Sequence, residues 1–254
     1  CRNHPYRIGM SRFVHILRTW IRIATDLVYP RRCACCGVDC ASEPGHLCWD
    51  CRQEISVIQP PFCDTCGMPV AGRVDHRFEC HQCGERGPKF DRARSTARFD
   101  GPVREAVHAF KYNGAFWVER DLVDLLESGL RVQYAGEQVD LVVPVPLFRA
   151  RFRERGYNQS ELLARGLARR ARLPFGARVL RRVRDTGSQT KLTASGRLSN
   201  VRQAFDVRRP RAVAGRVVLV IDDVMTTGAT LSECARVLRR AGARKVLALT
   251  VARG

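Results

Sequence analysis

Residues 217–230 read VVLVIDDVMTTGAT, and this stretch constrains the fold more than any other part of the chain. Five consecutive apolar residues lead directly into Asp222 and Asp223, and a turn of Thr and Gly follows. A strand without polar alternation fits a parallel sheet that is covered on both faces. Such sheets bind ligands beyond the carboxyl ends of their strands, where these two acids are expected to lie.

The pattern after residue 90 alternates between short strands and helices. Apolar spacing predicts helices over residues 104–110, 118–126, 159–171 and 231–240. Apolar runs predict strands at 141–145, 217–221 and 246–251, and Gly242 is expected to end the last helix. Strands and helices in this order imply right-handed βαβ units and an α/β fold with a parallel sheet flanked by helices.

The turn after the two acids suits a phosphate group. Free N–H groups and the dipole at the start of the following helix favour an anion there. Thr226, Thr227 and Thr230 add hydroxyl donors, and Gly228 permits close approach. Ionised carboxylates repel phosphate, but they accept hydrogen bonds from vicinal sugar hydroxyls or share Mg²⁺ with them. We therefore expect a ribose 5-phosphate here. The structural alternative is an Asp pair that only caps a βα turn.

The amino-terminal third holds eleven of the twelve cysteines, all before residue 84. They include four CxxC steps, and two such turns complete a tetrahedral zinc site. Four thiolates leave no open position for substrate, so both sites are expected to be structural. The predicted ligands are Cys33, Cys36, Cys48 and Cys51 for one zinc ion, and Cys63, Cys66, Cys80 and Cys83 for the other.

Other interpretations of these cysteines remain open at this point. Cys35 or Cys40 offers a substitute ligand for the first zinc ion, and His46, His76 and His81 also lie near the CxxC steps. A redox motif would occur once beside a βαβ unit rather than four times in succession. Disulfide bonds do not fit a cytoplasmic chain.

A cytoplasmic location without membrane contact is expected, because no stretch approaches the roughly 20 apolar residues of a membrane span. Residues 13–28 are interrupted by Arg18, Arg22 and Asp26, which predicts an amphipathic helix rather than a signal peptide. Met10 offers a natural start, which would make residues 1–9 an upstream extension.

Positive charge is concentrated in the larger part of the chain. The formal net charge is +19, and residues 91–254 hold 32 basic against 16 acidic residues, whereas residues 1–90 hold 12 against 9. One interpretation is an Arg-rich soluble surface. The other is a polyanionic partner, such as a phosphorylated metabolite or nucleic acid, which clustered Arg binds well.

Several further blocks support a resemblance to a known family. They are FKYNG at 110–114, VVPVPLFRARFRERGYNQ at 142–159 and RDTGSQTKLTASGRLSNVRQAF at 184–205. VVLVIDDVMTTGAT resembles the phosphoribosyl-pyrophosphate (PRPP) signature of type I phosphoribosyltransferases. With the CxxC steps, the set resembles the ComF family of double zinc ribbon, phosphoribosyltransferase-like proteins. The resemblance covers nearly everything after about residue 30, with Cys35 and Cys40 as its only evident departures. The domains expected are an extension with the amphipathic helix (1–29), a double zinc ribbon (30–89) and a type I phosphoribosyltransferase-like domain (90–254).

The resemblance implies roles for individual residues. Asp222 and Asp223 are the implied catalytic residues, on the ribose hydroxyls. The turn implied to bind the 5-phosphate comprises Met225, Thr226, Thr227, Gly228, Ala229 and Thr230. Val145 and Pro146 fall where the pyrophosphate loop lies, unless the prolines merely end a strand. Arg155 belongs to four alternating arginines that suit diphosphate contacts. Lys191 and Arg197 lie in a stretch like the mobile hood of this fold, or in a plain surface loop.

Four further residues carry expectations of their own. Lys111 and Asn113 of FKYNG are expected to face the site, unless this block only packs through its aromatic residues. Asn158 fits the N-cap of the helix that follows it. Cys234 is expected in the core.

The implied activity is phosphoribosyl transfer from PRPP with Mg²⁺ and release of pyrophosphate, linked to DNA uptake or nucleotide salvage. The alternative is a non-enzymatic competence adaptor that uses its zinc module to dock a helicase-like partner and single-stranded DNA. Direct binding of single-stranded DNA needs exposed aromatic residues interleaved with Arg, and the sequence shows no obvious run of them. Nothing in the sequence identifies the acceptor.

Overall fold

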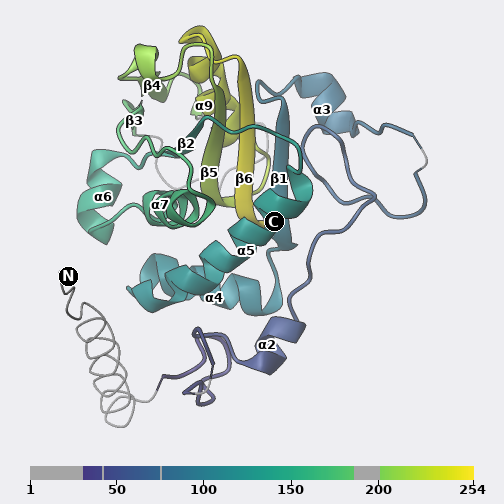
Figure 1. The fold of residues 1–254 in the computed structure, drawn as a ribbon, viewed down its shortest axis with the longest axis vertical. Helices are drawn as coiled ribbons and strands as arrows, with labels where there is room; N and C mark the ends of the chain where they lie inside the picture. Colours follow the sequence, from purple (N-terminus) through teal and green to yellow (C-terminus); the bar gives the residue numbers. More distant parts are fainter. Residues whose placement is uncertain (1–30, 42, 75, 186–200) are drawn as a thin grey trace, which may run out of the picture.

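The computed structural model describes residues 31–254 except 42, 75 and 186–200, so the helix expected over residues 13–28 lies outside the described residues (Figure 1). In none of the described helices do length and apolar character suffice for crossing a membrane. In chain order the elements are α2 (Trp49–Gln53), α3 (His81–Arg86), β1 (Arg92–Arg98), α4 (Gly101–Tyr112), η1 (Phe116–Val118), α5 (Glu119–Gln133), β2 (Leu141–Pro144), α6 (Arg149–Arg155), α7 (Gln159–Ala171), β3 (Leu180–Arg182), β4 (Phe205–Val207), η3 (Pro210–Ala212), β5 (Val217–Met225), α9 (Ala229–Arg240) and β6 (Lys245–Arg253).

The main sheet is parallel throughout, in the order β1-β6-β5-β2, and β3 and β4 form a separate antiparallel pair. The predicted α/β fold with a parallel sheet is confirmed. The predicted strand at 217–221 continues to Met225 as β5, so Asp222 and Asp223 are part of the strand itself. Helix α7 has the predicted bounds.

Apolar side chains of β5 alternate between two separate cores. Leu219 and Ile221 pack with α4, α5 and α7 on one face of the sheet. Val218 and Val220 pack with α9 and the β3–β4 pair on the other face. Both faces of this strand are therefore buried, as its unbroken apolar sequence predicts.

The cysteine-rich region packs against both cores and crosses one edge of the sheet. Cys33, Cys40, Cys48 and Cys51 belong to the core on the α4–α5 side, whereas Cys63, Cys66 and Cys83 belong to the core on the α9 side. Figure 1 shows α2 beyond α4 and α5, and α3 beside the opposite end of β1. Between them, residues 56–58 run along β1, with hydrogen bonds from Ile58 N to Thr96 O (2.9 Å) and from Arg98 N to Ser56 O (2.9 Å).

The opposite edge of the sheet is covered as well. The backbone of Val142 in β2 donates to Pro174 O and accepts from Gly176 N, at 2.9 Å in each case. Short segments outside the sheet thus pair with both of its outer strands.

Strand β1, with the sequence RARSTAR, was not among the predicted strands. Arg94, Ser95 and Thr96 are buried in it, although their polarity argues against a core position. Each has a polar partner. Arg94 donates to Asp64 O (2.9 Å), Ser95 bonds Thr250 Oγ1 (2.7 Å), and Thr96 donates to Leu125 O (3.1 Å). Hydrogen bonding removes most of the cost of burying such groups.

Candidate functional site

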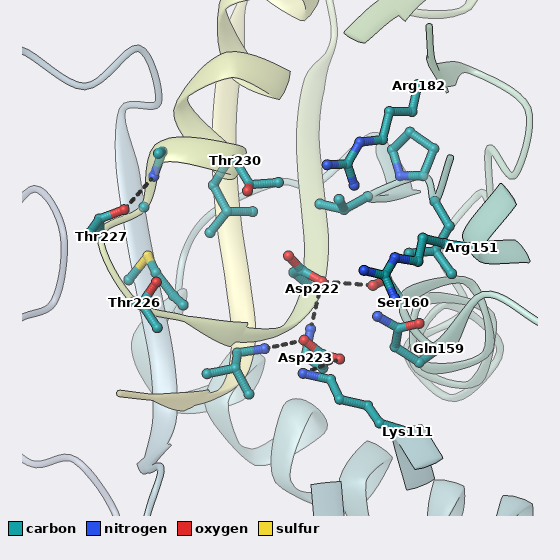
Figure 2. Close-up of a pocket in the computed structure, with 18 of the residues that line it drawn as sticks. Lys111, Arg151, Gln159, Ser160, Arg182, Asp222, Asp223, Thr226, Thr227 and Thr230 are labelled. Atoms are coloured by element: carbon teal, nitrogen blue, oxygen red, sulfur yellow. Dashed lines mark hydrogen bonds and ion pairs between the residues drawn. The ribbon is translucent and has the colours of Figure 1, made fainter. Parts of the chain in front are cut away.

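A pocket of about 260 Å³ lies beyond the carboxyl ends of β2 and β5 (Figure 2). The turn before α9 forms one side of it, and β5 forms its floor. Residues after β2, one face of α6 and the start of α7 form the other side. Its charged lining residues are Lys111, Arg151, Arg155, Arg182, Asp222 and Asp223. Two acids on the floor thus have cations gathered on one side and helix α9 on the other.

The two acids have different surroundings because successive side chains of a strand point to opposite faces. Asp222 accepts a hydrogen bond from Ser160 Oγ (2.7 Å) at the start of α7. Asp223 is 3% exposed, and Lys111 Nζ of α4 lies 2.9 Å from its Oδ2. That contact is an ion pair without an aligned hydrogen bond, so Oδ2 of Asp223 keeps unused acceptor capacity.

The pKa of Asp222 is raised to about 7 by burial of its carboxyl group and, secondarily, by the negative charge of Asp223. The hydrogen bond from Ser160 and the charge of Lys111 act in the opposite direction. Asp222 therefore changes its ionisation near neutral pH. Its ionised form accepts hydrogen bonds from two hydroxyl groups or binds a cation; its protonated form does so poorly.

The turn between β5 and α9 leads to the free backbone N–H groups at the start of α9. Gly228 adopts φ +73°, a left-handed conformation that favours glycine, and α9 begins directly after it. Thr227 Oγ1 accepts from Ala229 N at 3.4 Å, a long hydrogen bond. All six predicted residues of this turn line the pocket, namely Met225, Thr226, Thr227, Gly228, Ala229 and Thr230, and Met225 is only 2% exposed. The geometry of a helix N-terminus facing a polar pocket suits a phosphate group.

The residues after β2 face this turn across the pocket. Val145 and Pro146 both line the pocket. Asn158 holds them against α7, because its side chain donates to Val145 O (3.0 Å) and accepts from Ser160 N (3.2 Å). Its expected N-cap geometry is present. One side chain thus fixes both the loop after β2 and the serine that contacts Asp222.

The four alternating arginines form helix α6, which the sequence analysis did not predict. Residues four apart lie on one face of a helix. Arg151 and Arg155 accordingly line the pocket, while Arg149 and Arg153 line a different hollow. Arg155 donates to Gln159 Oε1 (2.6 Å), and its guanidinium lies 5.4 Å from the ring centroid of Tyr112.

The remaining predicted residues divide into three groups. Lys111 faces the site, Phe110 is fully buried, and Asn113 is exposed outside the pocket. Cys234 is in the core, as predicted. Lys191 and Arg197 lie outside the described residues.

Sequence reasoning missed Gln159, Ser160 and Arg182 in the pocket. For the first two, a signal was available, because both open the helix that Asn158 caps. Arg182 carried no such signal, since it is one of two adjacent arginines in a three-residue strand.

The predicted zinc ligands form two groups of four thiols, and within each group all sulfur atoms lie within 4.8 Å of one another. Sγ–Sγ distances of 3.6 Å for Cys36–Cys48 and 3.7 Å for Cys66–Cys80 match the edge of about 3.8 Å that Zn–S bonds of about 2.3 Å produce in a tetrahedron. We call residues 31–55 the first ribbon and residues 61–87 the second ribbon. Both groups fit zinc without an open position.

Cys35 and Cys40 are not in the first group of thiols. Cys35 Sγ donates to Pro102 O (3.2 Å), and Cys40 Sγ lies 3.7 Å from Val38 O. His46 points its ring at Trp117, with centroids 6.1 Å apart. In the described part of the chain, the first four-thiol group is thus the simple CxxC set.

A second hollow, of about 330 Å³, opens beside the pocket and shares Lys111, Arg151 and Arg155 with it. Its lining includes two exposed aromatic residues, Tyr112 (61% exposed) and Phe116 (49% exposed). The sequence shows no run of aromatic residues interleaved with Arg, but folding gathers them here from separate segments.

Comparison with known proteins agrees with this architecture. A double zinc ribbon domain model matches residues 24–84, and a phosphoribosyl transferase domain model matches residues 158–254. Competence protein F of Haemophilus influenzae is 30% identical over 226 residues, which cover 87% of this chain and 96% of that protein. DNA utilization protein YhgH of Escherichia coli K12 is 32% identical over 222 residues (80% and 94%), and competence protein ComFC of Bacillus subtilis is 28% identical over 202 residues (77% and 79%). The chain thus belongs to the ComF family, with a double zinc ribbon followed by a phosphoribosyltransferase-type domain.

Proposed function

We propose that this protein binds PRPP with Mg²⁺ and transfers its phosphoribosyl group to an acceptor, releasing pyrophosphate. The observation that carries the proposal is the order of groups across one pocket (Figure 2). The N-terminus of α9, the two acids and the cluster of Lys and Arg follow one another as the 5-phosphate, the ribose hydroxyls and the diphosphate do in PRPP.

The charges in the pocket fit this ligand. Asp222 faces the space where ribose hydroxyls would lie, and Ser160 holds its orientation. Asp223 keeps Lys111 at the pocket wall. Arg151 and Arg182 enter the pocket from the side opposite the threonine turn (residues 225–230), and their guanidinium groups point into it, where a departing diphosphate would need cations.

The chemistry needs positioned charge more than a strong base. As the bond from C1 to the diphosphate breaks, positive charge develops on the sugar and negative charge on the leaving group. In the proposed orientation, Asp222 would lie on the sugar side of this separation, and Arg151 and Arg182, which line the same pocket, on the leaving-group side. Mg²⁺, when bound with the diphosphate, would neutralise part of its charge, and the ionised carboxylate of Asp222 is a suitable oxygen ligand.

Calorimetry with PRPP and Mg²⁺ tests the binding step. We expect binding in the micromolar range by the wild type and its loss in the double variant Asp222→Asn/Asp223→Asn. Asp124→Asn should bind normally, because Asp124 does not line the pocket and pairs with Arg170 in the last turn of α7, at the other end of that helix from Ser160. Unchanged binding by the double variant would contradict the proposal. Release of pyrophosphate on addition of ammonia or nucleobases then reports transfer.

The hollow beside the pocket favours a second candidate function, binding of single-stranded DNA. Stacking of a base on Tyr112 or Phe116 is worth about 1–3 kcal/mol, and nearby arginines would hold the phosphates. The relatives named for competence and DNA utilization support this link. Docking of a helicase-like partner by the zinc module stays a prediction from the family.

An oligonucleotide titration at increasing salt tests the DNA candidate. We expect a steep fall in affinity with salt and a further loss in Tyr112→Ala. Trp49→Ala removes an aromatic residue that is 64% exposed on α2 and should have no effect. An affinity that does not depend on salt would refute this candidate.

A further inference from the structure

The second ribbon lies directly behind the turn that faces the pocket. A cavity of about 40 Å³ separates them, lined by Cys66 and Cys83 on one side and by Met225 and Gly228 on the other. Phe90 fills the junction, since its ring lies 3.6 Å from the position that a Cβ on Gly228 would occupy. The zinc site of the second ribbon therefore lies behind the threonine turn, on the side away from the pocket.

Arg253 is the polar connection between the two. It is 7% exposed at the end of β6, and its Nη1 donates to Cys66 O at 2.8 Å. Its Nη2 lies 3.7 Å from Cys66 Sγ, one of the four thiols. The buried Nε of the same side chain has no hydrogen-bond partner. The position of this guanidinium thus depends on a single cysteine.

The backbone around Arg253 also contacts the residue that begins the threonine turn. Arg253 pairs with Met225 in the β5–β6 register, and Gly254 N donates to Met225 O at 3.1 Å. Met225 is the last residue of β5 before the turn. A second connection joins Lys89, just after the second ribbon, to the first turn of α9 through Ser232 Oγ (3.0 Å).

We propose that Arg253 is a positioning residue that couples metal occupancy of the second ribbon to ligand binding at the threonine turn. A zinc ion with four thiolates carries about two negative charges, which the Arg253 guanidinium offsets. Without the metal, the Cys66 turn loses its fixed position, and a buried cation loses its partners. The ends of β6 and β5 then shift, and the N–H groups at the start of α9 lose their alignment. This inference rests on the proposed function, because the ligand is a ribose 5-phosphate.

The first ribbon supplies the internal control. Its Arg52 has contacts of a similar kind, to Leu47 O (2.9 Å) and to Asp121 Oδ1 (2.6 Å). Those partners lie on the α4–α5 side of the sheet, and the contacts described for the first ribbon do not include the threonine turn.

Coupling between two binding sites is reciprocal. If zinc in the second ribbon strengthens ligand binding at the threonine turn, the bound ligand must also strengthen zinc binding. The test measures zinc release to a colorimetric chelator from protein loaded with two zinc ions, with and without ribose 5-phosphate. Zinc release is expected in two kinetic phases, one from each ribbon. Cys36→Ser disrupts the zinc site of the first ribbon, so the phase that remains in this variant belongs to the second ribbon. We expect the ligand to slow that phase about tenfold and to leave the other phase unchanged. Arg253→Met should abolish the protection, Arg253→Lys should restore part of it, and Arg52→Met should keep it.

The outcomes separate the two proposals. If calorimetry shows no binding of ribose 5-phosphate or PRPP by the zinc-loaded wild type, both fail. If the ligand binds but slows neither phase, or slows both equally, only the coupling fails. Full protection in a folded Arg253→Met variant that still binds the ligand would also overturn the role of Arg253.

Discussion

The two ribbons carry the same CxxC chemistry, but they are joined to the rest of the molecule in opposite ways. The first ribbon presents an arginine and a backbone N–H to a carboxylate, since Arg52 and His46 N both bind Asp121 of α5. The second ribbon presents carbonyl oxygens and a thiolate to two arginines of the sheet, Arg94 and Arg253. Arg253 is buried in the sheet beside the threonine turn, so it connects the second ribbon to the pocket. We therefore expect the two metal sites, although they share one motif, to have separate effects on the pocket.

The largest effect on stability is expected from Asp121→Ala, which breaks the docking of the first ribbon. Asp121 is 3% exposed, and its loss leaves His46 N and the Arg52 guanidinium without their acceptor. We expect a loss of about 3 kcal/mol in the free energy of unfolding, measured with urea on the zinc-loaded protein. Asp124→Ala on the same helix should cost about 0–1 kcal/mol, because its pair with Arg170 is half-exposed and Arg170 keeps Glu127 as a second partner. Weaker ribose 5-phosphate binding in Asp121→Ala would mean that the two ribbons do not act separately.

A smaller effect distinguishes the two ribbons at matched positions. Gly37 and Gly67 each follow the second cysteine of a CxxC step, with φ of +75° and +67°. A Cβ on Gly37 meets nothing within 4 Å, whereas one on Gly67 lies 2.9 Å from Ala93 O in β1. Gly37→Ala should therefore cost about 1 kcal/mol of unfolding free energy from backbone strain alone, and Gly67→Ala about 2–3 kcal/mol. Equal costs would show that the second ribbon is not seated on β1 as described.

The smallest effect concerns pH and belongs to the pocket. The pKa of Asp222 is raised to about 7 by burial and by Asp223, so its protonated form favours the folded state. Its contribution to stability is present below the unfolded pKa near 4 and is lost as the pH rises through 7. Binding of ribose hydroxyls needs the ionised form, so affinity should rise toward pH 7, by at most about tenfold per pH unit, and then level off.

Calorimetry of ribose 5-phosphate across this pH range provides the measurement. Ser160→Ala removes a hydrogen bond that lowers the pKa of Asp222, so the midpoint should move to higher pH. Asp121→Ala should leave the profile in place, because none of the described residues of the first ribbon lines the pocket. A profile that Ser160→Ala leaves unshifted would contradict the assignment of the midpoint to Asp222.

Sequence reasoning reached the elements whose apolar residues are continuous or helically spaced, as in β5 and α7. It missed β1, because Arg94, Ser95 and Thr96 are buried there only by virtue of partners from other segments. A single sequence does not show which distant carbonyl or hydroxyl will satisfy a polar side chain.

The candidate site divides in a similar way. Asp222, Asp223 and the threonine turn follow one another in the chain, so their adjacency could be predicted. Arg182 enters the pocket from the β3–β4 pair, and Lys111 from α4. Their meeting depends on how the layers pack, which local spacing does not encode.

The segment that joins the ribbons has a consequence for any attempt to shorten this protein. Residues 56–58 pair with the outer side of β1, and residues 174–176 pair with the outer side of β2. A protein trimmed to begin at residue 90 would leave the backbone of β1 open to strands of neighbouring molecules, a common start of aggregation. We therefore expect the phosphoribosyltransferase-type domain to precipitate when the amino-terminal third is removed.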